Sequence, residues 1–281
     1  MTAGLIKVLK PSYGSLFLES FWGKKSLCTA TGFVVMSNSL PYLITNWHVV
    51  SGRHPETRKL LSSHGVAPDR LRVRHNRTMM RDGHEIVEYP LYEDNCPLWK
   101  VHSTLGNVVD VVALPLAWPD SNQRFGFDPY DLSEPDVGIS LKPTSPVSVV
   151  GYPFGISTGH GLAIWAQAFV ASEPEIDYGN RPIFLADGRM RPGQSGSPVL
   201  FAKNDLVLYR DGSRRLDNDM QTEFLGVYSG RIRDDSDLGL VWKRAAVRDV
   251  AENGVLDQLD ASWQVGLIAH LPGEADVSNS R

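Results

Sequence analysis

The 281-residue chain has little cysteine, no long hydrophobic run and no excess of basic charge. Its two cysteines, Cys28 and Cys96, are too few for the disulfide framework of many secreted proteins, so we expect two buried free thiols in a reducing compartment. No segment approaches the roughly 18 apolar residues of a membrane span, and the N-terminus lacks a signal-peptide core. The net charge of -4 gives no basis for nucleic-acid binding. These absences predict a cytoplasmic protein that binds neither a membrane nor nucleic acid.

The apolar segments are short and rich in β-forming residues. Clusters of Gly, Pro, Asn or Asp separate them, as hairpin connections require. This pattern predicts an all-β barrel or sandwich. A single short helix is expected over residues 244–253, with Gly254 as its C-terminal cap. The expected strands cover residues 15–22, 27–36, 42–45, 108–114, 147–150, 162–171, 198–202, 223–229 and 238–243.

The segment RPGQSGSPV over residues 191–199 has the features of a nucleophilic serine turn. A serine hydroxyl is a weak nucleophile, so it needs a neighbouring base and N–H groups aimed at the oxyanion that forms on attack. The glycines that flank Ser195 permit a tight turn, in which the N–H groups of Gly193 and Ser195 can form an oxyanion hole. The alternative is a surface turn rich in glycine and serine.

Two further segments supply a candidate base and a candidate carboxylate. His48 follows the apolar segment LITNW, and imidazole suits a general base because it titrates near neutrality. Asp110 opens the apolar run VVALPL, and a buried carboxylate is costly unless a partner such as an imidazole N–H pairs with it. The alternatives are a core histidine bonded to a backbone carbonyl and a strand-edge aspartate that faces water.

The three segments occur in the order His48, Asp110, Ser195, and together they resemble the trypsin-like, chymotrypsin-fold serine peptidases. The resemblance is to the disulfide-free bacterial type, which includes HtrA-like and glutamyl-endopeptidase-like enzymes. It implies an all-β fold of two six-stranded antiparallel β-barrels of the chymotrypsin type with a short C-terminal helix. The matching segments are TGFVV (31–35), TNWHVV (45–50), DVVALPL (110–116), VGYPFG (150–155) and GQSGSP (193–198).

The resemblance also implies a domain organisation and an activity. An N-terminal barrel over 12–118 would carry His48 and Asp110, and a barrel with helix over 136–258 would carry Ser195. A linker over 119–135 would join them, and 259–281 would form a tail. The implied activity is a serine endopeptidase that acts on proteins or peptides through an acyl-enzyme, without metal or organic cofactor.

The sequence says less about substrate specificity and regulation than about the fold and the activity. Gln194 stands where digestive relatives have an aspartate that pairs with a newly cut N-terminus, so we expect no activation by such cleavage. In the family, the positions of Arg189 and of residues 227–231 line the primary pocket. Arg189 or Arg231 could favour acidic substrates there, or could point to solvent. Ser229 and Gly230 are candidates for backbone pairing with an extended substrate.

Other functions stay open at this stage. The domain could be a catalytically silent binding module, or an effector that a regulatory protein partner activates. Histidines gather between residues 48 and 102, but none has the spacing of a zinc site. Arg70, Arg72 and Arg74 alternate as they would on one solvated face of a strand.

Overall fold

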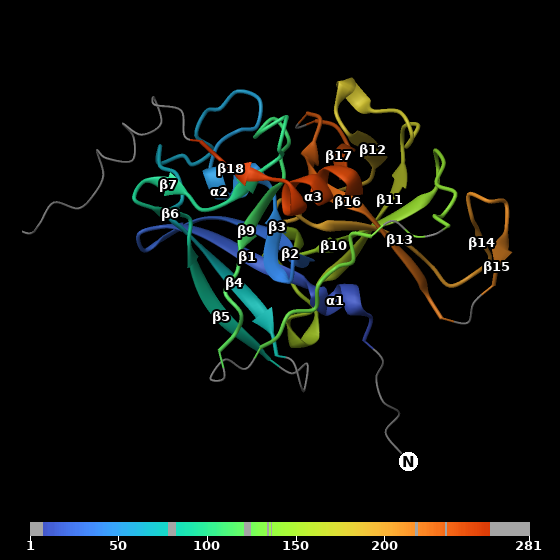
Figure 1. Cartoon of the computed structure of the whole chain (residues 1–281), viewed down its shortest axis with the longest axis horizontal. Coiled ribbons are helices and arrows are strands. Elements are labelled where there is room, and N and C mark those ends of the chain that lie inside the picture. The colour runs from blue at the N-terminus through green and yellow to red at the C-terminus, as the bar shows by residue number, and fades with distance from the viewer. Residues whose placement is uncertain are drawn as a thin grey trace, which may run out of the picture.

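The computed structural model describes residues 8–77, 83–120, 125–133, 135, 137–216, 219–233 and 235–258. Its strands form two groups, with helix α3 (Arg244–Glu252) between them (Figure 1). The all-β prediction is confirmed, since strands dominate and helices are short. Within the described ranges, none of the helices is long and apolar enough to cross a membrane. The other helical segments are α1 (Lys10–Gly14), α2 (Trp47–Ser51), η1 (Pro153–Gly155), η2 (Gly159–Gly161) and η3 (Tyr178–Asn180).

The N-terminal half is built on an eight-stranded sheet with the order β18-β8-β9-β3-β2-β1-β4-β5. In β4, Leu71 and Val73 are buried in the core of this half, whereas Arg70 and Arg72 bind Glu88 of β5 on the outer face. The expected alternation is therefore present. The strands are β1 (Ser15–Trp22), β2 (Lys25–Ser37), β3 (Leu40–Thr45), β4 (Arg70–Asn76), β5 (His84–Pro90), β8 (Lys100–Val101), β9 (Val112–Pro115) and β18 (Val255–Leu256), beside the separate hairpin β6 (Tyr92–Glu93) and β7 (Cys96–Pro97).

The C-terminal half contains a closed six-stranded barrel, as the resemblance implied, with the order β10-β11-β12-β17-β16-β13. Val149, Val199 and Val241 are fully buried inside it. Strand β12, a short strand between two loops, was not among the predicted strands. The strands are β10 (Pro146–Gly151), β11 (Ile164–Val170), β12 (Ile183–Asp187), β13 (Pro198–Lys203), β16 (Gln221–Arg231) and β17 (Leu238–Lys243), and a hairpin of β14 (Val207–Leu208) and β15 (Arg214–Arg215) lies outside the barrel.

Helix α3 joins the two halves through a shared apolar core. Val247 and Val250 belong to the same buried cluster as Val111 of the first half and Val227 of the second. The helix is close to its expected range, but its C-cap is Asn253 and not Gly254. A Cβ atom at Gly254 would lie 2.2 Å from the carbonyl oxygen of Val250, so glycine here allows a close backbone approach. The shared core fixes the two halves against each other, and the candidate site lies at their junction.

The cysteine prediction is half right. Cys28 and Cys96 are free, but both are exposed and not buried. Cys28 pairs with Ser20 near the end of the β1–β2 ladder, and Cys96 lies in a two-residue strand, so neither reaches a core.

The segment expected as a linker contributes the buried Tyr130 to the shared core, and the expected tail, 259–281, lies outside the described residues. The domain boundaries stay a prediction.

Candidate active site

His48 is the second residue of α2, a single helical turn that follows β3. Asn46 caps the turn in an extended conformation. Gly52 ends it with a left-handed φ of 64°, and its N–H donates to the carbonyl oxygen of His48 at 3.0 Å. The strand predicted over residues 42–45 ends at Thr45, as β3 does. The helical turn that follows was not predicted, and it positions the imidazole at the end of the sheet.

Asp110 lies directly against His48. Its carboxylate is 2% exposed, and Oδ2 lies 2.7 Å from Nδ1 of His48. Oδ1 accepts the backbone N–H of His48 at 2.9 Å, and Oδ2 also accepts the hydroxyl of Ser229 at 2.6 Å. Because an ionised carboxylate can only accept hydrogen bonds, Nδ1 carries a proton and Nε2 of a neutral His48 is the free acceptor. Asn46 adds a hydrogen bond from Nδ2 to the carbonyl oxygen of Asp110, at 2.7 Å.

Ser195 lies in a tight turn that precedes β13. The side-chain oxygen of Gln194, which is buried, accepts the backbone N–H of Arg191 at 2.7 Å and closes the turn from inside. Gly193 and Gly196 have φ values of 94° and 82°, a region that favours glycine. The flanking glycines therefore have the backbone freedom for which the sequence analysis selected them.

The carbonyl groups of Pro192, Gly193 and Ser195 are held by donors. Pro192 O accepts the N–H of Phe154 at 2.6 Å, Gly193 O accepts the hydroxyl of Thr31 at 2.8 Å, and Ser195 O accepts the N–H of Thr31 at 2.8 Å. In contrast, the N–H groups of Gly193 and Ser195 have no hydrogen-bond acceptor among the described residues. These two donors are therefore available to a ligand.

The structure brings His48, Asp110, Ser195 and Ser229 to the lining of one cleft of about 500 Å³ at the junction of the two halves. Gly230 and Arg231 line it as well, next to Ser229 at the end of β16. Arg189 does not belong to the described lining. Its side chain is 80% exposed, with Nε 3.9 Å from a carboxylate oxygen of Asp237.

Three contacts that hold the candidate triad and its turn in place were not predicted from the sequence. The hydroxyl of Ser229 was not expected at Asp110, although a serine that ends an apolar strand segment is a usable signal. The side chain of Thr31, and that of Asn46, bind backbone carbonyls from segments far along the chain. Contacts of this kind depend on the tertiary arrangement, so nothing in the local sequence indicates them.

A second cavity, of about 210 Å³, shares His48, Leu61 and Ser195 with the cleft, and Gly193 belongs to the lining of this second cavity. Leu27 and Cys28 of β2 form part of its wall. Ser195 is therefore in the lining of both cavities. Across the described residues, no group of three or more His, Cys, Asp or Glu side chains is placed to hold a metal ion.

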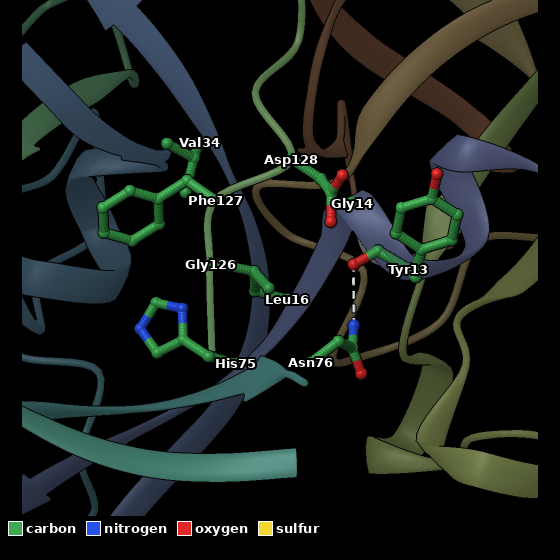
Figure 2. A pocket seen from close by; sticks show the side chains of 9 residues that line it. All are labelled: Tyr13, Gly14, Leu16, Val34, His75, Asn76, Gly126, Phe127 and Asp128. Atoms are coloured by element: carbon green, nitrogen blue, oxygen red, sulfur yellow. Dashed lines mark hydrogen bonds between the residues drawn. The ribbon is translucent and has the colours of Figure 1, made fainter. Parts of the chain in front are cut away.

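A third, very small cavity of about 10 Å³ lies away from the cleft, around His75 and Asn76 at the end of β4 (Figure 2). Asn76 Nδ2 donates to the carbonyl oxygen of Tyr13 at 2.7 Å, which ties β4 to α1. His75 is 1% exposed, its Nε2 lies 3.0 Å from the hydroxyl of Tyr89, and its ring stacks on Phe125. Burial lowers the pKa of His75 to about 3. This histidine is therefore a neutral core residue, outside the candidate site.

The fold and the cleft agree with a family match in the sequence. Residues 30–207 match the trypsin-like peptidase domain, which is more than half of the chain. The chain therefore belongs to the trypsin-like peptidase family. Its class is that of the serine-type endopeptidases, which are hydrolases of peptide bonds.

Solved structures similar to this chain include three proteases. The serine endoprotease from Yersinia pestis is 14% identical, with 87% of this chain and 65% of that chain covered and a TM-score of 0.46. The active form of the Rv3671c protease from M. tuberculosis is 18% identical, with 89% and 85% covered and a TM-score of 0.44. The thermostable serine protease AL20, from an extremophilic microorganism, is 10% identical, with 86% and 97% covered and a TM-score of 0.48.

Proposed function

We propose that this chain is an active endopeptidase that cleaves protein or peptide substrates through Ser195, His48 and Asp110, with an acyl-enzyme intermediate. One observation carries the proposal. Asp110 is a buried carboxylate whose oxygens are taken up by Nδ1 and the backbone N–H of His48 and by the hydroxyl of Ser229. A purely structural aspartate has no need to hold an imidazole at the edge of a large cleft, whereas a general base needs such an orienting group.

In the proposed first step, Nε2 of His48 takes the proton from the hydroxyl of Ser195. The serine oxygen then forms a bond to the scissile carbonyl carbon. The imidazolium that results is stabilised by the negative charge of Asp110 and gives its proton to the departing amine, which leaves an ester on Ser195. A water molecule, activated by His48 in the same way, hydrolyses that ester and releases the new carboxyl terminus. The residues need no cofactor for any of these steps.

The negative charge that develops on the substrate oxygen would be met by the N–H groups of Gly193 and Ser195. Their availability supports this role, because the neighbouring carbonyls are already bonded to Phe154 and Thr31 and so point elsewhere. Preorganised donors of this kind do not have to reorient during the reaction, which is the source of their effect.

The turn around Ser195 supports activity without proteolytic activation. Gln194 is a neutral amide, and its side-chain oxygen is satisfied by the N–H of Arg191 within the same turn. The geometry of the turn therefore does not depend on an ion pair between residue 194 and a newly formed N-terminus.

The proposal is tested by incubating the purified full chain with unfolded casein. We expect peptide products from the parent, and a loss of about a thousandfold or more in rate for Ser195→Ala and for His48→Ala. Cleavage that persists in Ser195→Ala would contradict the proposed nucleophile. A folded parent that produces no peptides would favour the silent binding module or the partner-activated effector over the proposal, and rapid cleavage without any added partner would exclude the effector.

A further inference from the structure

The cleft beside Ser195 has an open position at Gly230 and three arginines in its lining. At Gly230, no atom comes within 4 Å of the position that a Cβ would take. Leu240 and Trp242 of β17 line the same cleft. The absence of a side chain at Gly230 therefore leaves room for a substrate side chain at the end of β16.

Three arginines line this cleft: Arg58 from the N-terminal half, and Arg181 and Arg231 from the C-terminal half. Arg58 is held by neutral groups only. Its guanidinium donates to the backbone and side-chain oxygens of Asn107, at 3.2 and 3.0 Å, and lies 4.6 Å from the ring centroid of Trp47. Its positive charge is thus fixed in place by contacts that do not neutralise it.

The other two arginines are also poorly neutralised. Arg231 is exposed and forms no ion pair with any residue that the structure describes. Arg181 has a carboxylate oxygen of Glu56 at 3.9 Å, but that side chain is 69% exposed, and such surface pairs are weak. The other carboxylate in the lining, Asp110, is already bonded to His48.

We propose that this cleft selects substrates with an acidic side chain in the few residues N-terminal to the scissile bond. This inference rests on the proposed function. A guanidinium binds a carboxylate through paired hydrogen bonds. An arginine that has no ion pair within the protein does not have to break one in order to bind a substrate carboxylate. The cleft includes the end of β16, the segment that the family resemblance assigns to the primary pocket, so it receives the acyl side of the substrate. The residues that carry the selection are Arg231 and Arg181.

The test uses pairs of peptides that are identical except for glutamate or glutamine at one of the three residues immediately N-terminal to the scissile bond. We expect kcat/KM to be about fivefold higher for the best glutamate peptide than for its glutamine partner, which corresponds to about 1 kcal/mol. High salt should reduce this preference because it screens the charges. Arg231→Gln and Arg181→Gln should each lower the preference.

Arg233→Gln is the matched control, because Arg233 is two residues from Arg231, lies outside the cleft lining and pairs with Asp235 at 3.4 Å. It removes the same charge and should leave the preference unchanged. Equal kcat/KM for both peptides of every pair would overturn the inference. An equal loss of preference in Arg233→Gln and Arg231→Gln would also overturn it, because the effect would then be one of overall charge.

Binding to Ser195→Ala separates this inference from the proposed activity. Fluorescence anisotropy of the labelled peptides with this variant measures affinity without any cleavage. Tighter binding of the glutamate peptide by Ser195→Ala, and loss of that difference in Ser195→Ala/Arg231→Gln, would support the cationic cleft even if the chain cleaved no peptide. Equal affinity for the two peptides would overturn it, whatever the catalytic result.

Discussion

The carboxylate of Asp257 accepts a hydrogen bond from the indole N–H of Trp47 at 2.7 Å. The same oxygen accepts the indole of Trp99 at 3.0 Å, and the other oxygen accepts the side-chain amide of Asn107 at 3.1 Å. Trp47 immediately precedes His48, and Asn107 begins the segment that leads to Asp110. The segment after α3 therefore returns to the N-terminal half and anchors the supports of the candidate base and carboxylate.

Asp257→Asn is expected to destabilise the protein by about 3 kcal/mol. The NH2 group of the asparagine would replace a carboxylate oxygen that accepts hydrogen bonds. One of the two indoles, or Asn107, would then have a buried N–H group without an acceptor. Urea denaturation of the variant and the parent measures the difference. Asp187→Asn, on the exposed end of β12, is the control and should change stability little. Equal effects of the two substitutions would show that Asp257 is not a structural anchor.

The contacts of Asp110 predict a graded loss of activity. Asp110→Asn should lower kcat by about ten-thousandfold because it removes the negative charge and allows the wrong imidazole tautomer. Ser229→Ala should lower kcat by about tenfold, since it removes one hydrogen bond to a charged group. Peptide hydrolysis at saturating substrate measures both. Ser197→Ala is the control, because its buried hydroxyl has no hydrogen-bond partner among the described residues. If Ser229→Ala were as active as Ser197→Ala, the hydrogen bond from Ser229 to Asp110 would have no role in catalysis.

Gly193→Ala should lower kcat by about a hundredfold or more. The added methyl group would lie 2.3 Å from the carbonyl oxygen of Tyr152, so the backbone N–H of residue 193 must move. Gly212→Ala is matched in backbone strain, with a φ of 81° against 94°, but its methyl group would meet nothing within 4 Å. If both variants retain full activity in a peptide assay, Gly193 has no role in the oxyanion hole.

Because burial lowers the pKa of His75, we expect the protein to lose stability in mild acid. The pKa of His75 is about 3 in the folded protein and about 6.5 in the unfolded chain, so below pH 6.5 the unfolded chain binds a proton that the folded protein does not. The free energy of unfolding should therefore fall by about 2 kcal/mol between about pH 7 and pH 5, from this group alone. Denaturant titrations at both pH values measure it. His75→Phe should lose this part of the pH dependence, and an unchanged dependence in that variant would contradict the assignment.

Much of the fold could be predicted from local sequence, because alternating and continuous apolar segments specify strands directly. The segments around β1, β10 and β13 illustrate this, as does helix α3. Strand β12 was missed although its apolar residues, IFLA, form a run as long as segments that were predicted as strands. The helical turn α2 was missed because it is only five residues long, which is too short to show helical periodicity. Both cysteines were placed wrongly because exposure depends on where a strand ends relative to the core.

The candidate triad could be selected from the sequence because its three segments occur together in the order found in trypsin-like peptidases, whereas each segment alone left an alternative open. The supports of the triad could not, since Thr31, Asn46 and Ser229 act through contacts with segments far away in the chain. Of the two arginines that the sequence suggested for the primary pocket, only one lines the cleft. Arg231 lies in the cleft, whereas Arg189, chosen by its distance from Ser195, is on the surface. The relation to HtrA-like or glutamyl-endopeptidase-like enzymes stays a prediction.

The central claim is that Ser195 is a nucleophile activated by His48 and held in place by its surroundings. Reaction of the folded full chain with a fluorophosphonate, followed by peptide mass spectrometry, tests it most directly. The account predicts one adduct per chain, located on Ser195, which is absent in Ser195→Ala and strongly slowed in His48→Ala. A folded parent that forms no adduct on Ser195, or one that reacts equally well without His48, would contradict it.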